Sequence, residues 1–136
     1  MNAVDTNVLI YAIDTQAGVK HQQARDFVDR LDPDMTVMLW QVVQEFGGVA
    51  ARIGRQRKDD QTGRLLQARL IEMFEILVPP VSVFAQAWTL GDRYKLSYYD
   101  ALILAACADA GVKRLYTEDL QAGQTIEGVE LVNPFV

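Results

Sequence analysis

Four acidic residues stand where an α/β fold would bring their carboxylates together. Asp5 ends a short apolar run, Asp119 follows a second run at Val112–Thr117, and Glu45 lies early in a helical segment. The carboxyl ends of parallel strands share one edge of a sheet, and ligands bind outside that edge. Asp100 completes the set in the first turn of another helical segment, where the helix dipole favours a carboxylate. We therefore expect one acidic site at this edge.

Such a cluster of carboxylates favours a particular chemistry. Like charges in one cleft repel, and some carboxyls stay protonated unless cations join them. Oxygen ligands without histidine or cysteine suit Mg²⁺ or Mn²⁺. The chain has one histidine, His21, and one cysteine, Cys107, so a single chain cannot build a Cys/His zinc site. The reaction that makes most use of an acidic metal site is phosphoryl transfer by a metal-activated water.

Each acid also has a plain structural alternative. Asp5 could serve only as a turn or N-cap residue, and Asp100 could only complete a capping box with the serine three residues before it. Asp119 could cap a short helix, which would leave Glu118 as the metal ligand. Glu45 is the clearest candidate, because an acid on a largely apolar helix face needs a partner.

Polar residues flank these acids. Thr6 and Asn7 follow Asp5, and Thr117 precedes the last pair of acids. Their hydroxyl and amide groups could orient the carboxylates or bind a metal-bound water. The alternative is ordinary turn chemistry, which we favour for Thr6.

The pattern of short apolar runs between longer amphipathic segments predicts the fold class. Interleaved strands and helices favour a parallel sheet covered by helices on both faces. We expect an α/β fold, a three-layer α/β/α sandwich with a four- or five-stranded, mainly parallel sheet, as a single domain over residues 1–136. Strands are predicted near 2–4, 35–40, 75–78, 112–117 and 129–132. Helices are predicted directly after Asp5 and over 18–31, 41–53, 60–74, 82–94 and 98–110, with a further short helix after 119.

Cap residues predict several helix boundaries. Gly54 is expected to end one helix, and Asp59 or Asp60 to begin the next. Ser82 and Ser97 are expected to be N-caps.

Charge is uneven along the chain. The 136 residues carry a net charge of −5, which taken alone argues against a general nucleic-acid binder. Residues 51–69, however, hold six basic and two acidic side chains, a net +4, so the remainder carries −9. A basic stretch on an acidic body is compatible with phosphate contacts beside a carboxylate cluster, and a solvated helix hairpin is the equal alternative.

Composition limits the cellular setting. Half of the residues are apolar, which argues against disorder. The apolar stretch Ala101–Ala108 is far shorter than the roughly 20 residues that cross a bilayer. No secretory leader precedes the first strand, and Cys107 cannot form an internal disulfide, so we expect a reduced, cytoplasmic location without membrane association.

Four segments together resemble the successive motifs of PIN domains. They are Val4–Leu9, Gln44–Phe46, Tyr99–Ile103 and Tyr116–Leu120, and the closing Asn133–Phe135 also fits. Each motif is short, but the four occur in the right order with suitable separations. More closely, the whole chain is similar to the VapC-type toxins of prokaryotic toxin–antitoxin pairs.

The resemblance implies an α/β/α endoribonuclease that depends on Mg²⁺ or Mn²⁺, prefers single-stranded RNA and leaves 5′-phosphate and 3′-hydroxyl ends. It also implies a VapB-like antitoxin that covers the site, and a homodimer. The family's four acidic positions match Asp5, Glu45, Asp100 and Asp119, and its supporting positions match Asn7 and Thr117. Contacts to the RNA backbone are expected from the basic stretch, in particular Arg52, Arg55, Arg57 and Lys58.

Two other functions compete with this one. In a phosphatase of the haloacid-dehalogenase kind, the aspartate after the first strand is the nucleophile, but a second aspartate is needed two residues on, where this chain has Asn7. The other alternative is a non-catalytic module whose carboxylates dock a basic peptide.

Overall fold

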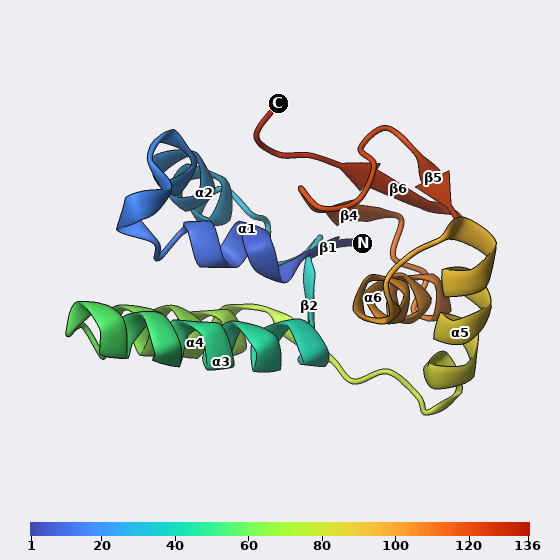
Figure 1. Ribbon diagram of the computed structural model, residues 1–136, viewed down its shortest axis with the longest axis horizontal. Helices are drawn as coiled ribbons and strands as arrows, with labels where there is room; N and C mark the ends of the chain where they lie inside the picture. The colour runs from blue at the N-terminus through green and yellow to red at the C-terminus, as the bar shows by residue number, and fades with distance from the viewer.

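A mainly parallel sheet forms the centre of the computed structural model, which describes all residues from 1 to 136 (Figure 1). Strand β1 pairs with β4, and β4 pairs with β6, all in parallel. Strand β5 forms an antiparallel edge on β6. The strands are β1 Asn2–Val4, β2 Val37–Leu39, β3 Glu75–Leu77, β4 Arg114–Tyr116, β5 Thr125–Ile126 and β6 Val129–Val132.

Strands β2 and β3 form a second parallel pair that continues the sheet beyond β1. A single parallel bridge between Asn2 and Thr36 joins the two parts. The spatial order is therefore β3-β2-β1-β4-β6-β5, with β1 in the interior. The predicted mainly parallel sheet is confirmed: four strands, β1-β4-β6-β5, form the sheet, and the β2–β3 pair extends it through the bridge at Asn2. The missed strand, Thr125–Ile126, is too short to carry a periodic signal.

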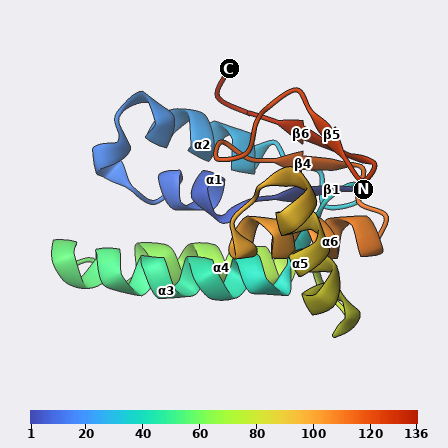
Figure 2. The same ribbon diagram turned by 45° about the vertical axis from the view of Figure 1, so that its right-hand side comes forward.

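The helices cover both faces of the sheet, as predicted for an α/β/α sandwich. On one face, Phe27 of α2 packs edge-on against Tyr116 of β4, with ring centroids 4.8 Å apart. Helix α6 lies on the opposite face, and α5 packs beside it (Figures 1 and 2). The helices are α1 Thr6–Tyr11, α2 Val19–Asp29, α3 Trp40–Arg57, α4 Thr62–Met73, α5 Ser82–Tyr94 and α6 Tyr98–Asp109, with a 3₁₀ turn at Thr15–Ala17.

One apolar core holds these layers together. It contains residues from the sheet and from all six α-helices. Its largest fully buried side chains include Leu9, Met38, Phe46, Leu70 and Leu104. None of the helices has the length and apolar character needed to cross a bilayer.

Helices α3 and α4 form an antiparallel hairpin that projects from the sheet (Figures 1 and 2). The prediction that Gly54 ends α3 is wrong, because the helix continues to Arg57 and ends at Lys58, whose φ is 54°. Gly54 is required for a different reason. A Cβ atom there would lie 2.5 Å from the carbonyl oxygen of Asp59, so only glycine lets the turn pack this closely.

Two predicted helix starts are also shifted. Helix α4 begins at Thr62, and Asp59 stays outside it while its carboxylate accepts hydrogen bonds from the Thr62 amide (3.2 Å) and hydroxyl (2.6 Å). Ser82 is the first residue of α5 and does not cap it, since Val81 occupies the N-cap position. The predicted N-cap Ser97 is confirmed, because its hydroxyl accepts from the Asp100 amide at 3.3 Å.

Candidate active site

Asp5 occupies the turn between β1 and α1. It is the N-cap of α1, and its Oδ1 accepts a hydrogen bond from the Thr6 amide at 2.7 Å. Its own amide donates to the carbonyl of Tyr116 in β4 at 2.8 Å. Asp5 is only 5% exposed. It therefore serves as the predicted N-cap, and it is also a buried carboxylate held between two parallel strands.

A second hydrogen bond ties Asp5 to the end of β4. The hydroxyl of Thr117, which is fully buried, donates to Asp5 Oδ2 at 2.7 Å and accepts from the Asp119 amide at 3.2 Å. The chain forms β2 and β3 on one side of β1, then crosses to form β4 on the other side. Asp5 and Thr117 thus lie at a topological switch point, where open α/β sheets bind their ligands.

The four predicted acids line one pocket at this point. Its volume is about 270 Å³. Four separate segments contribute the acids: Asp5 from the β1–α1 turn, Glu45 from α3, Asp100 from α6, and Asp119 from the loop after β4. The four acids therefore line the same pocket, as the sequence predicted. The rest of the lining is Thr6, Asn7, Ile10, Tyr11, Val49, Tyr99 and Ile103.

The four carboxylates have unequal surroundings. Asp5 is buried, Asp100 is half-buried, and Glu45 and Asp119 are exposed. Glu45 was expected to need a partner because it would lie on an apolar helix face. This reason is wrong, because Glu45 is exposed. It does have a partner, since the Thr6 hydroxyl donates to Glu45 Oε2 at 3.3 Å. This bond gives Thr6 a role beyond the turn.

Burial controls the protonation of Asp5. Loss of solvent raises the pKa of its carboxyl to about 6, against the hydrogen bonds from Thr117 and the Thr6 amide, which lower the pKa. The negative charges of Asp100 and Asp119 also contribute to this rise in the pKa. A cation in the pocket would reverse both unfavourable effects, because it replaces lost solvation and offsets the repulsion.

The pocket offers oxygen ligands but no closed cage. No group of three or more Asp, Glu, His or Cys side chains is placed to hold one metal ion by direct contact. The donor chemistry nevertheless suits Mg²⁺, which usually keeps several waters and takes only one or two carboxylates directly. Asn7 adds a further polar group. Its amide oxygen and nitrogen are both buried without a hydrogen-bond partner at the pocket wall, so they are free to bind a ligand or its water.

Glu118 is engaged away from the pocket. The hydroxyl of Tyr11 donates to Glu118 Oε1 at 2.6 Å, and Lys20 forms an ion pair with Oε2. These two contacts hold the pKa of Glu118 below its usual value. Asp119 lines the pocket and Glu118 does not. The alternative that Glu118 is the metal ligand is therefore disfavoured by the geometry, as is a short helix after Asp119, where the structure has bends and turns.

Two aromatic residues of the pocket were missed from the sequence. Tyr11 lies six residues after Asp5 at the end of α1, and Tyr99 directly precedes Asp100. Their adjacency to the acidic motifs was the only available signal. Tyr99 is 74% exposed at the pocket rim.

The four predicted RNA-binding residues lie in the second half of α3 and at its end. Arg52, Arg55 and Lys58 are exposed. Arg57 is half-buried and forms an ion pair with Asp14, so its charge is already neutralised. Arg52 follows Glu45 by two helical turns, on the same face and roughly 10 Å along the axis. Of these four residues, Arg52 is therefore the nearest to the pocket along the helix.

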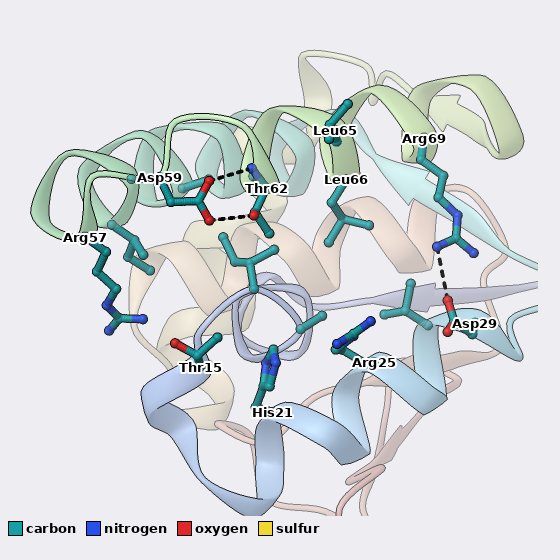
Figure 3. Close-up of a pocket in the computed structure, with 17 residues that line it drawn as sticks. Thr15, His21, Arg25, Asp29, Arg57, Asp59, Thr62, Leu65, Leu66 and Arg69 are labelled. Carbon is teal, nitrogen blue, oxygen red and sulfur yellow. Dashed lines mark hydrogen bonds and ion pairs between the residues drawn. The ribbon is translucent and has the colours of Figure 1, made fainter.

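A larger groove lies between α2 and the α3–α4 hairpin (Figure 3). Its volume is about 720 Å³. Apolar residues such as Ile13, Val28 and Leu66 line it, and Arg25 and His21 point into it from α2 (Figure 3). Arg25 forms no ion pair, whereas the other two arginines of the groove, Arg57 and Arg69, pair with Asp14 and Asp29.

The sheet order, the switch-point pocket and its four carboxylates define an acidic α/β site of the kind expected from the motifs. The PIN domain family model matches residues 3–125. The chain belongs to the PIN domain family. A comparison with curated proteins found no match.

Solved structures share the fold over nearly the full chain. The FitAcB structure from Neisseria gonorrhoeae has a TM-score of 0.72 at 18% identity and covers 99% of both chains. A toxin–antitoxin complex from Klebsiella pneumoniae has a TM-score of 0.67 at 22% identity and covers 98% of both. VapC20 of Mycobacterium tuberculosis, a toxin that cleaves the sarcin–ricin loop, has a TM-score of 0.67 at 18% identity, over 88% of this chain and 90% of its own.

Proposed function

We propose that this protein is a metal-dependent endoribonuclease and the toxin of a VapBC-type toxin–antitoxin pair. The observation that carries the proposal is the pocket at the β1–β4 switch point, where Asp5, Glu45, Asp100 and Asp119 meet. Membership of the PIN family and the likeness to toxin structures support it.

The chemistry follows from the donors. Mg²⁺ or Mn²⁺ bound here would activate water and neutralise charge on a phosphodiester, leaving 5′-phosphate and 3′-hydroxyl ends. Asp5 would be the central ligand, because Thr117 and the Thr6 amide fix both of its oxygens. Asp100, Asp119 and Glu45 would bind the ion directly or through its waters.

Residues around the acids would bind the substrate. The unpaired amide of Asn7 is suited to a metal-bound water or a phosphate oxygen. Arg52 and Arg55 would contact the RNA backbone, and Lys58 would extend this track toward the hairpin tip. Arg57 has a smaller part, because Asp14 already holds its guanidinium.

We also propose a VapB-like antitoxin as partner, which would cover the acidic pocket and anchor in the neighbouring groove. The groove between α2 and the hairpin suits an amphipathic segment, because apolar residues line it and the unpaired Arg25 could bind an acidic side chain. A homodimer is part of the proposal and would use α5, where Phe84 and Trp88 are four residues apart, 52% and 65% exposed. We place the toxin in the cytoplasm, where its RNA substrate is found.

Incubation with RNA tests the activity. We expect cleavage of single-stranded RNA in Mg²⁺ or Mn²⁺, and none with a chelator. Asp100→Asn should abolish cleavage, whereas Asp109→Asn should not, because Asp109 is exposed at the far end of the same helix. Metal-dependent hydrolysis of a small phosphomonoester without RNA cleavage would favour a phosphatase instead. Absence of both activities would favour the non-catalytic docking module.

A further inference from the structure

Four side chains from distant parts of the chain meet beside the acidic pocket. Tyr11 ends α1, Lys20 lies at the start of α2, Glu118 follows β4, and Phe135 is the penultimate residue. We call this group the Tyr11 clamp. Its centre is the Glu118 carboxylate, with the Tyr11 hydroxyl on one oxygen, at 2.6 Å, and the Lys20 ammonium on the other.

Two aromatic rings pack against the Lys20 side of the ion pair. The Tyr11 and Phe135 rings pack edge to face with their centroids 5.5 Å apart. The Lys20 nitrogen lies 5.3 Å from the centroid of Tyr11 and 6.0 Å from that of Phe135, within cation–π range. The Glu118 side chain is 19% exposed and that of Lys20 44%, and both oxygens of Glu118 have partners. This arrangement is more constrained than an exposed ion pair, which holds its side chains only loosely.

The Tyr11 clamp contacts the loop that carries Asp119. Thr117 is bonded to Asp5, Glu118 is bonded to Tyr11 and Lys20, and Asp119 lines the pocket. Residues 118–120 form a bend, in which the Asp119 amide donates to the Thr117 hydroxyl at 3.2 Å. Tyr11 and Lys20 therefore fix the residue that lies between Thr117, which is bonded to Asp5, and the pocket residue Asp119.

We propose that Tyr11 and Lys20 are positioning residues, which act through Glu118 to hold Asp119 in the acidic pocket, with Phe135 packing the clamp from the end of the chain. The proposal rests on the proposed nuclease function of that pocket. It assigns to Glu118 a role different from metal binding, and it makes the last residues of the chain part of the active-site structure.

A second trio in the same molecule provides a matched control. The Tyr94 hydroxyl donates to Glu127 Oε1 at 3.0 Å, and Arg93 pairs with the same oxygen at 2.8 Å. None of the three lines the acidic pocket. Tyr94→Phe removes one hydroxyl from a tyrosine–glutamate–cation group, as Tyr11→Phe does, but outside the acidic pocket.

Steady-state cleavage of a single-stranded RNA in Mn²⁺ separates positioning from stability. We expect Tyr11→Phe to lower kcat by about tenfold or more, because small misplacements of reacting groups are costly, with less than a twofold change in KM. Tyr94→Phe should leave both parameters unchanged. Lys20→Met should act like Tyr11→Phe, and Lys20→Arg should restore most of kcat. A wild-type kcat in Tyr11→Phe, or equal losses in both tyrosine variants, would overturn the proposal.

Hydrogen exchange gives a readout that does not depend on activity. The Asp119 amide donates to Thr117 Oγ1, so its exchange rate reports the order of the loop. We expect faster exchange at Asp119 in Tyr11→Phe than in Tyr94→Phe. Should the wild-type protein cleave no RNA, the proposed function fails, and this comparison still decides the clamp, because equal exchange rates would overturn it.

Discussion

At the residue scale, the chemistry depends on the burial and the hydrogen bonds of the Asp5 carboxyl group. Asp5 is buried beside two other acids, yet a hydroxyl and an amide bond both of its oxygens. Burial and charge repulsion raise the pKa of Asp5 more than these two bonds lower it, so ionised Asp5 destabilises the folded protein when no metal is bound. Because its pKa is raised to about 6, the free energy of unfolding should depend on pH.

Asp5→Asn should remove that dependence. The unfolded chain ionises Asp5 near pH 3.8 and the folded chain only near 6, so unfolding becomes easier as the pH rises through this window. Relative to wild type, the variant should gain about 2 to 3 kcal/mol of unfolding free energy between pH 4 and pH 7. Urea denaturation in chelator measures this difference. A difference that stays constant with pH would show that Asp5 ionises normally.

Thr117→Val should make Asp5 harder to ionise. Valine keeps the shape of threonine but cannot donate to Asp5 Oδ2, and a hydrogen bond to a charged group is worth about 1.5–3 kcal/mol. The acidic limb of the pH–rate profile for RNA cleavage should therefore move upward by one pH unit or more. Thr117→Ser keeps the hydroxyl and should leave the limb near its wild-type position. An unchanged profile in the valine variant would remove Thr117 from the site.

At the element scale, the α3–α4 hairpin positions both the acid and the basic residues. Helix α3 carries Glu45 at the pocket and Arg52 two turns further on. The hairpin turn closes only because Gly54 has no side chain. Another glycine of the same helix, Gly48, has no atom within 4 Å of the place a Cβ would take.

These two glycines should respond oppositely to alanine. Gly54→Ala forces the Asp59 carbonyl to move and should cost about 1–3 kcal/mol, the usual range for overpacking. Gly48→Ala meets nothing and should stabilise the protein by about 0.5–1 kcal/mol, because alanine favours the helix. Denaturant midpoints at constant slope would measure both. Destabilisation by Gly48→Ala would contradict this prediction, because it would show that the added methyl group meets another part of the protein.

At the scale of the whole molecule, two openings serve different tasks in our proposal. The small acidic pocket lies at the sheet edge, and the larger groove lies between α2 and the hairpin (Figure 3). They share no residue, so substitutions can separate catalysis from binding of the antitoxin.

Leu65→Glu should weaken antitoxin binding without loss of RNA cleavage. Leu65 lines the groove and is 65% exposed, so the substitution should not unfold the protein. Ile71→Glu is the control, because Ile71 is 53% exposed on the same helix but outside the groove. Co-elution with the antitoxin in size-exclusion chromatography measures the effect. Equal retention by both variants would exclude this groove as the docking site.

Much of the site was predictable from the sequence. The four acids follow strands or begin helices, and parallel strands bring such positions to one edge. Periodicity also predicted nearly every helix, because the apolar spacing of a helix is local. The sheet was less predictable, because its strands are only two to four residues long and depend on partners elsewhere in the chain.

The sequence by itself thus determined which residues could form the site and the fold class that brings them together. Only the tertiary structure decided how each acid is used. The bond from Thr117 to Asp5 spans 112 residues, and the bond from Tyr11 to Glu118 spans 107. The first contact holds Asp5 in place. The second engages Glu118 outside the pocket, so that Asp119 is the acid of this pair that lines it. Folding also buries Asp5, and this burial raises its pKa. Burial and hydrogen bonds between distant segments exist only in the folded chain. A local pattern of residue types therefore cannot predict them.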